Sequence, residues 1–294
     1  MTVKSVGFIG LGAIGRPMAV HVAYAFDAVV WNRTLANAES FASRHGARVA
    51  QTPAELVSAV DAVITCLPTS AEVFEVVSTI GDAWRSGHLL IDATSGDPAG
   101  SRRTAAFLEE RGVGFVDAPV SGGTSGAEAG TLTVMLGGNE PWVAMAREVA
   151  GCYAAKVEHV GPIGAAHALK AVNNALLAVN ILAAGEGLAA LVKLGVKADV
   201  ALEIINASSG RSNVTENLFP ERVTSRAWPR TFRLALLDKD VGVALQVLQD
   251  YGVPAAAIAT TKEAFGKARK LLGEEADHVE LVKMIEREAG VEIK

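Results

Sequence analysis

Three closely spaced glycines near the N-terminus constrain the fold more than any other feature of this chain. The motif Gly10-Leu11-Gly12-Ala13-Ile14-Gly15 follows an apolar, β-rich run at residues 3–9 and precedes a helical segment. In this context Gly10 permits a tight turn, Gly12 lets the backbone approach a pyrophosphate, and Gly15 lets the helix pack on the strand. We therefore expect residues 10–15 to bind a dinucleotide at a helix N-terminus, in preference to forming a glycine-rich turn without a ligand.

Apolar β-rich runs alternate with helical stretches through the first half of the chain. Such alternation is typical of βαβ units in a mostly parallel sheet. Beyond Gly161 the hydrophobic period becomes helical, and no convincing strand follows. We predict an α/β Rossmann-type domain over residues 1–161 and an all-helical substrate and oligomerisation domain over residues 162–294. The expected strands lie at 3–9, 28–31, 62–67, 88–92, 114–117, 132–136 and 157–160, and the expected later helices at 165–194, 198–207, 232–248 and 254–272.

Composition narrows the functional classes. The chain has 27 basic and 32 acidic residues without a basic stripe, so we expect no nucleic-acid partner. Cys66 and Cys152 lie in apolar surroundings and predict neither a disulfide framework nor a metal site, which favours a reducing compartment. Glycines and Arg16-Pro17 interrupt the apolar N-terminus, unlike a secretory signal, so we expect a cytoplasmic protein. Polar residues also interrupt the apolar segment 163–194, which favours a buried helix over a membrane span.

The end of the second expected strand bears on cofactor choice. NAD-selective folds usually place an acidic residue about 20 residues beyond the glycine motif to bind the ribose hydroxyls. Asn32, Arg33 and Thr34 stand there instead. A guanidinium suits a 2′-phosphate, so NADP is favoured over NAD. The alternative is that Arg33 stacks on the adenine or is solvated.

Two further turns follow expected strands. Leu67-Pro68 comes after the run at 62–67, and Thr94-Ser95 comes after the run at 88–92. Ligands of open α/β sheets bind at the carboxyl ends of strands, so the two turns and the glycine motif predict one ligand crevice. Either turn alone would be an ordinary connection about as often as a site.

Lys170 and Asn174 are the candidate catalytic pair. Lys170 lies on an alanine-rich helix, where desolvation would lower its pKa toward the range useful for acid–base catalysis. Asn174, four residues on, shares its helix face. The alternative reading is a snorkelling lysine and a helix–helix hydrogen bond. His167 we expect to be packed or solvated and outside the site, and the aspartates flanking Lys239, Asp238 and Asp240, to be solvated or locally paired.

A second glycine-rich loop begins at Ser121-Gly122-Gly123, directly after an expected strand. Its backbone N–H groups and hydroxyls can bind an anion, and a substrate carboxylate is a natural occupant. The competing reading is a flexible surface loop.

The chain resembles the β-hydroxyacid dehydrogenases, the family of 3-hydroxyisobutyrate dehydrogenase and tartronate semialdehyde reductase. The resemblance implies a catalytic Lys170, a substrate carboxylate bound by Ser121, Gly122, Gly123 and Asn174, and Lys239 near the nicotinamide. Two departures are conservative: Ala25-Phe-Asp27 replaces a usual glycine turn, and Thr94-Ser95 reverses the commoner order. The motifs that carry the resemblance are Gly7 to Met18, Asp117-Ala-Pro-Val-Ser-Gly-Gly123 continuing to Gly138, Gly161 to Asn174, and Lys239-Asp240.

The resemblance implies an NAD(P)-dependent oxidoreductase that acts on a small 3-hydroxy acid or its semialdehyde, with 3-hydroxyisobutyrate favoured among several substrates. An imine reductase and a catalytically silent NADP-binding interaction protein are the rivals. Imine reductases generally lack a lysine at this helix position, and the silent protein would be expected to have lost it, whereas Lys170 is present. A 6-phosphogluconate dehydrogenase needs a longer helical domain. The small helical domain also predicts a homodimer or homotetramer.

Overall fold

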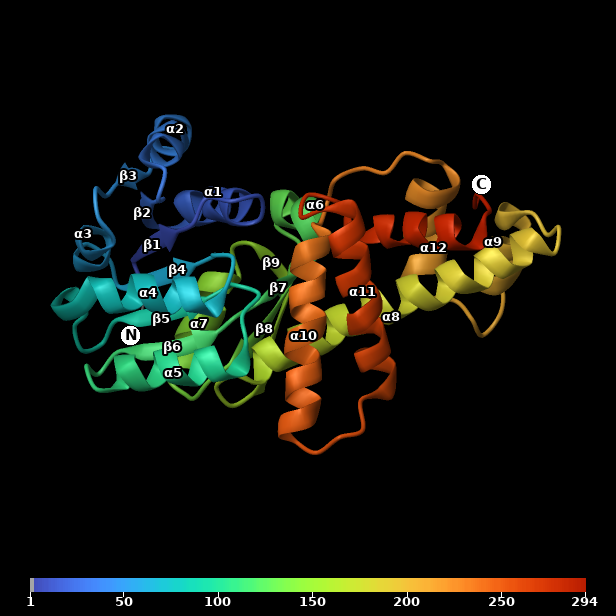
Figure 1. Ribbon diagram of the computed structural model, residues 1–294. Helices are drawn as coiled ribbons and strands as arrows, with labels where there is room; N and C mark the ends of the chain where they lie inside the picture. Colours follow the sequence, from blue (N-terminus) through green and yellow to red (C-terminus); the bar gives the residue numbers. More distant parts are fainter. Residues whose placement is uncertain (1–2) are drawn as a thin grey trace. The chain divides into compact units, whose positions relative to one another are not determined.

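The computed structural model describes residues 3–294 and divides into two compact units, Met1–Lys170 and Ala171–Lys294 (Figure 1). The division falls within a long helix, nine residues beyond the boundary that the change of hydrophobic period indicates. The boundary at residue 161 therefore stays a prediction. Each unit has its own hydrophobic core.

The first unit is built on a nine-stranded sheet in the order β3-β2-β1-β4-β5-β6-β8-β7, with β9 paired to β8. Pairing is parallel from β3 to β6 and between β8 and β9, and antiparallel where β8 meets β6 and β7. The mostly parallel sheet is confirmed. The strands are β1 (Ser5–Ile9), β2 (Asp27–Trp31), β3 (Arg48–Val49), β4 (Ala62–Thr65), β5 (Leu89–Asp92), β6 (Gly114–Asp117), β7 (Val120–Ser121), β8 (Leu132–Gly137) and β9 (Ala154–Gly161).

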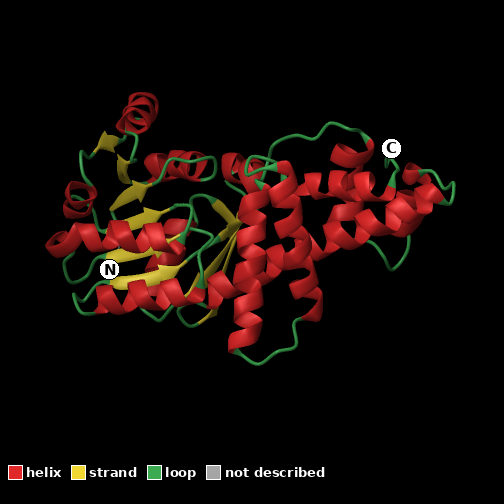
Figure 2. Cartoon of the chain, in the orientation of Figure 1, coloured by secondary structure: helices red, strands yellow, loops and turns green. Residues whose placement is uncertain are grey.

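Helices cover both faces of the sheet, as Figure 2 shows for this unit. Successive strand residues point to opposite faces, so Val29 packs under α3 and α4 while Val30 packs under α1 and α2. Burial on both faces explains why the central strands are apolar throughout. The helices are α1 (Gly15–Ala25), α2 (Leu35–His45), α3 (Pro53–Ser58), α4 (Ser70–Ile80), the 3₁₀ turn η1 (Gly81–Ala83), α5 (Pro98–Glu109), α6 (Gly123–Ala129) and α7 (Trp142–Ala150).

The strand order reverses between β1 and β4. From β1 the chain moves outward through β2 and β3, then returns to β4 on the other side of β1 and continues to β5 and β6. In open α/β sheets the ligand crevice forms outside the carboxyl ends of the strands at such a reversal. The glycine motif follows β1 and Leu67 follows β4, so both lie at this position.

The second unit is helical. Over residues 162–294, all of which the structure describes, the β structure beyond the strands named above is one isolated bridge between Arg233 and Asp277, which confirms the helical character. Its elements are most of α8 (Ala165–Lys193), α9 (Ala198–Asn206), the π-helical η2 (Val214–Thr224), α10 (Leu234–Asp250), α11 (Ala256–Leu272), the 3₁₀ turn η3 (His278–Glu280) and α12 (Leu281–Ala289).

Helix α8 is long and apolar enough to cross a membrane by length and composition. Those criteria are weak support for a span, since a core helix of a soluble protein meets them as well. Here Ala175, Ala178 and Ile181 of α8 are fully buried in the core of the second unit. The helix therefore has a structural role that accounts for its apolar sequence.

Candidate functional site

The glycine loop, residues 10–15, contains three glycines, and at two of them the neighbouring backbone leaves no room for a side chain. A Cβ on Gly10, whose φ is +104°, would lie 2.3 Å from the carbonyl oxygen of Cys66, and one on Gly15 would lie 2.1 Å from the carbonyl oxygen of Gly10. A Cβ on Gly12 would meet nothing within 4 Å. Gly10 and Gly15 thus bring the loop and α1 onto the end of β4, and Gly12 leaves an open face that a pyrophosphate can approach.

Asn32 braces this loop. Its Oδ1 accepts a hydrogen bond from the amide of Leu11 at 3.1 Å, and its Nδ2 donates to the carbonyl oxygen of Thr34 at 3.0 Å. Arg33 and Thr34 are exposed beside it. The structure therefore brings the glycine loop and the end of β2 together, with the Asn32 amide fixed by the loop and the Arg33 guanidinium at the surface.

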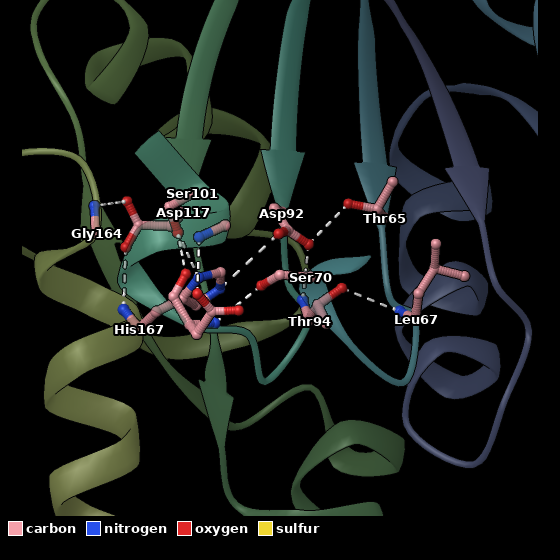
Figure 3. A network of polar contacts seen from close by, with 11 residues as sticks. Thr65, Leu67, Ser70, Asp92, Thr94, Ser101, Asp117, Gly164 and His167 are labelled. Atoms are coloured by element: carbon pink, nitrogen blue, oxygen red, sulfur yellow. Dashed lines mark hydrogen bonds and ion pairs between the residues drawn. The ribbon is translucent and has the colours of Figure 1, made fainter. Parts of the chain in front are cut away.

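A buried carboxylate organises the two strand-end turns (Figure 3). The Oδ1 of Asp92 accepts hydrogen bonds from the Thr65 hydroxyl at 2.9 Å and from the Thr94 amide at 3.1 Å. The Thr94 hydroxyl in turn accepts from the Leu67 amide at 3.1 Å. Leu67 and Thr94, which the sequence assigns to one crevice, are therefore joined directly, and Pro68 and Ser95 follow them in the same two turns.

Cys66 is not a candidate nucleophile. Burial raises the pKa of its thiol to about 12, and the negative charge of Asp92 acts in the same direction. Nucleophilic cysteines need a lowered pKa and a thiolate. Cys66 therefore serves the packing beneath Gly10 and Gly15.

The second glycine-rich loop is partly open to solvent. Ser121 is half-buried at the end of β7, while Gly122 and Gly123 are exposed and have φ values of +135° and +65°. At the other end of the helix that follows, the Nε2 of His21 lies 3.0 Å from the carbonyl oxygen of Ala127. That contact ties the short helix α6 to α1, so the loop is attached to the element that begins at the cofactor motif.

Lys170 is half-buried, one turn into α8, and belongs to the first unit. His167, three residues earlier, is fully buried, and its Nδ1 lies 2.7 Å from the hydroxyl of Ser101. Its packing agrees with expectation, but its polar contacts to the strand ends were not anticipated. Its Nε2 is also 4.0 Å from the Oδ2 of Asp92, and its backbone amide donates to the Oδ2 of Asp117, so the first turn of α8 is joined to the ends of β5 and β6.

Asn174 and Lys239 meet in the second unit through a carboxylate. The Oδ2 of Asp240 accepts a hydrogen bond from the Asn174 amide at 2.6 Å, and its Oδ1 lies 3.1 Å from the Lys239 ammonium. Asp240 is 2% exposed. Local pairing with Lys239 was expected, and the bond from Asn174 to Asp240 is the helix–helix hydrogen bond of the alternative reading. It fixes which way the Asn174 amide faces. Asp238 instead pairs with Lys262 and Arg269.

The residues described above carry groups that suit a dinucleotide, an anion and proton exchange. Residues 3–294 contain no group of three or more histidine, cysteine or acidic side chains that could hold a metal ion. A half-buried lysine such as Lys170 can exchange a proton with an alcohol or carbonyl group.

Two family models together match most of the chain. Residues 5–161 match the NAD binding domain of 6-phosphogluconate dehydrogenase, and residues 164–285 match the model described as the NAD-binding domain of NADP-dependent 3-hydroxyisobutyrate dehydrogenase. NAD(P)-binding domains are therefore present.

Individual relatives cover nearly the whole chain. It is 35% identical to 2-(hydroxymethyl)glutarate dehydrogenase of Eubacterium barkeri, over 98% of this chain and 97% of that one. It is also 35% identical to human mitochondrial 3-hydroxyisobutyrate dehydrogenase, over 81% and 74% of the two chains. Among solved structures, 3-hydroxyisobutyrate dehydrogenase of Mycobacterium tuberculosis, described together with L-serine, matches with a TM-score of 0.90 at 29% identity, over 97% and 99%.

Proposed function

Because this chain belongs to the β-hydroxyacid dehydrogenase family, we propose that it transfers a hydride between NADP and a small 3-hydroxy acid or its semialdehyde. The observation that supports this most is the glycine loop. A Cβ on Gly12 would meet open space that a pyrophosphate could occupy, whereas a Cβ on Gly10 or Gly15 would meet a backbone carbonyl oxygen. When bound, the nicotinamide supplies the hydride acceptor or donor.

Lys170 is the proposed general acid and base. Oxidation of the alcohol requires removal of its hydroxyl proton, and reduction of the aldehyde requires a proton at the carbonyl oxygen, so one amine can serve both directions. Its ammonium form would also stabilise negative charge on that oxygen. Asn174 would hold the substrate, with its amide oriented by Asp240.

Ser121, Gly122 and Gly123 are the proposed binding residues for the substrate carboxylate. A hydroxyl and the amides of two glycines with positive φ can converge on one anion, as in other backbone anion sites. The two dehydrogenase relatives are named for 2-(hydroxymethyl)glutarate and 3-hydroxyisobutyrate, and the solved Mycobacterium tuberculosis structure is described with L-serine. In all three compounds a hydroxymethyl group is attached to the carbon that bears a carboxylate. We therefore favour a substrate of the 3-hydroxyisobutyrate type.

Steady-state assays with a panel of 3-hydroxy acids and semialdehydes, each with NADP(H) and NAD(H), test this proposal. We expect turnover of at least one carboxylated substrate and no turnover of its uncharged alcohol analogue. Reduction of cyclic imines without activity on the panel would favour an imine reductase. Tight NADPH binding with no turnover of any compound would favour a non-enzymatic interaction protein.

Arg33 supports NADP as the preferred cofactor. Its exposed guanidinium follows β2, where a 2′-phosphate would lie, and no acidic residue occupies positions 32–34. We expect Arg33→Ala to weaken NADPH binding about tenfold or more while changing NADH binding little, because a charge-assisted pair contributes about 1.5–3 kcal/mol. Cofactor fluorescence titrations measure both constants, with Arg44→Ala on α2 as the control. Equal losses for the two cofactors would rule out 2′-phosphate recognition.

A homo-oligomer is a further part of the proposal. Leu169 and Leu176 of α8 are 44% and 56% exposed, and they lie seven residues apart on one side of the helix. A second copy of the chain would bury such an apolar stripe. Light scattering coupled to size exclusion should give the mass of a dimer or tetramer, and Leu176→Glu should lower that mass. A wild-type monomer across the micromolar range would contradict this.

A further inference from the structure

His167 lies at the centre of a buried polar cluster that joins three elements of the first unit (Figure 3). Its imidazole is 0% exposed. Its Nδ1 is 2.7 Å from the hydroxyl of Ser101 on α5, and its Nε2 is 4.0 Å from the Oδ2 of Asp92 at the end of β5. Within residues 3–294, Nε2 makes no hydrogen bond. Most buried polar atoms of native proteins have a hydrogen-bond partner, so a fully buried ring nitrogen without one is uncommon.

Asp117 holds the backbone of the same helical turn. Its Oδ1 accepts a hydrogen bond from the amide of Gly164 at 2.8 Å, and its Oδ2 accepts from the amide of His167 at 3.0 Å. These are N–H groups at the beginning of α8, which have no partner inside the helix. The end of β6 therefore caps α8, and the strand and the helix start are joined by both carboxylate oxygens.

The loop after β5 is pressed against the imidazole. A Cβ on Gly96 would lie 2.7 Å from the Cε1 of His167 and 2.4 Å from the hydroxyl oxygen of Ser70. Gly96 directly follows Thr94-Ser95, the pair that borders the proposed crevice. The ring of His167 thus fills the space between the start of α8 and the turn that carries those hydroxyls, and neither can move toward the other.

The charged groups that face His167 come from two strands. Asp92 belongs to β5 and Asp117 to β6, while α5 contributes the neutral Ser101. Burial raises the pKa of Asp117, and the electrostatic interaction with His167 together with hydrogen bonds from the amides of Gly164 and His167 opposes that rise. The cluster therefore contains two buried carboxyl groups and the imidazole of His167, which lies three residues before Lys170 in the sequence.

We propose that His167 is a positioning residue for Lys170: its ring, held by Ser101 and faced by Asp92, fixes the first turn of α8 and so the placement of the ammonium in the crevice. The inference rests on the proposed role of Lys170. Because Lys170 is less than one turn further on, a small displacement of this turn moves the amine relative to the reacting oxygen. Misplacement by about 1 Å can lower a rate about 10²-fold.

Three substitutions separate the contributions. His167→Leu removes both ring nitrogens, Ser101→Ala removes the partner of Nδ1, and His167→Asn keeps an amide near the place of Nδ1. His45→Asn is the matched control, since His45 is a partly buried histidine on α2 away from the cluster. Thermal melts and NADPH titrations should first establish that each variant folds and binds cofactor.

Two readouts report on Lys170 directly. Competitive labelling with acetic anhydride at a series of pH values, read by mass spectrometry, gives the pH at which Lys170 is half reactive, with Lys193 as the internal reference, and it needs no substrate. Steady-state kinetics give kcat and KM separately. We expect His167→Leu to shift the Lys170 labelling midpoint and to lower kcat about 10- to 100-fold with little change in KM.

Rescue decides between positioning and simple packing. We expect His167→Asn to restore most of kcat and the labelling midpoint, and Ser101→Ala to reproduce a part of the His167→Leu defect. An unshifted Lys170 midpoint in a folded His167→Leu protein would overturn the inference. So would a fall in thermal stability with wild-type kcat. If the wild-type protein shows no dehydrogenase activity, the proposed function fails, but the labelling result still tests the position of Lys170.

Discussion

Replacing Lys170 with alanine is expected to lower kcat by a factor of about 10² or more, which is the usual contribution of a general acid or base. The substitution removes the proposed proton donor and acceptor from the crevice. NADPH affinity should stay close to that of the wild-type protein, because the glycine loop and Asn32, which form the cofactor side of the site, lie on other elements. Steady-state kinetics give kcat, and cofactor titration gives the NADPH affinity.

Lys193→Ala is the matched control, because Lys193 is an exposed lysine in the last turn of the same helix. It should keep wild-type kcat and show that loss of one positive charge on α8 has no effect by itself. Lys170→Arg separates charge from proton transfer, because a guanidinium stays protonated. Turnover near the wild-type rate in a folded Lys170→Ala protein would refute the assignment.

Much of the fold could be predicted because the hydrophobic period differs so clearly between the two halves. Each predicted strand has a counterpart, and residues 114–117 match β6 without change. The strands β3 and β7 were not predicted because each has two residues, too few for an alternating pattern.

In the second unit, hydrophobic periodicity indicates α12 but not η2. Pro220 lies inside η2, where it suggests a helix break, and the chain forms a π-helix there instead. Helix α12 was also not predicted, although Leu281, Val282 and Ile285 have helical spacing and are buried. The spacing of apolar residues in 281–289 therefore indicates a helix, whereas the sequence of η2 does not.

The polar contacts of the site are beyond sequence reasoning for a different reason. His167 meets Ser101, and Asn174 meets Asp240, across 66 residues of sequence in each case. A lone histidine on a helix face gives no indication of which strand end it will face. Motif spacing identifies Lys170 and the glycine loop because each motif is local, but the residues that orient them come from distant elements.

The glycine loop provides the second large expected effect. Gly15→Ala would place a Cβ 2.1 Å from the carbonyl oxygen of Gly10 and 3.2 Å from the Cβ of Cys66. The first obstacle is backbone, so α1 or the loop must move. We expect NADPH binding to weaken about 10²-fold, equivalent to about 2.7 kcal/mol, together with a lower thermal midpoint of the free protein.

Gly12→Ala distinguishes an effect on cofactor binding from an effect on protein stability. Its Cβ would meet nothing within 4 Å, so the free protein should keep its thermal midpoint, while NADPH binding should still weaken because the methyl group occupies the space that the pyrophosphate needs. Gly266→Ala on α11 is the control, since it also has open space, and a helical alanine should raise stability by about 0.5–1 kcal/mol. Wild-type NADPH affinity in Gly12→Ala would mean that the cofactor does not lie over this loop. A methyl group at position 12 can leave the affinity unchanged only if no part of the cofactor approaches that position.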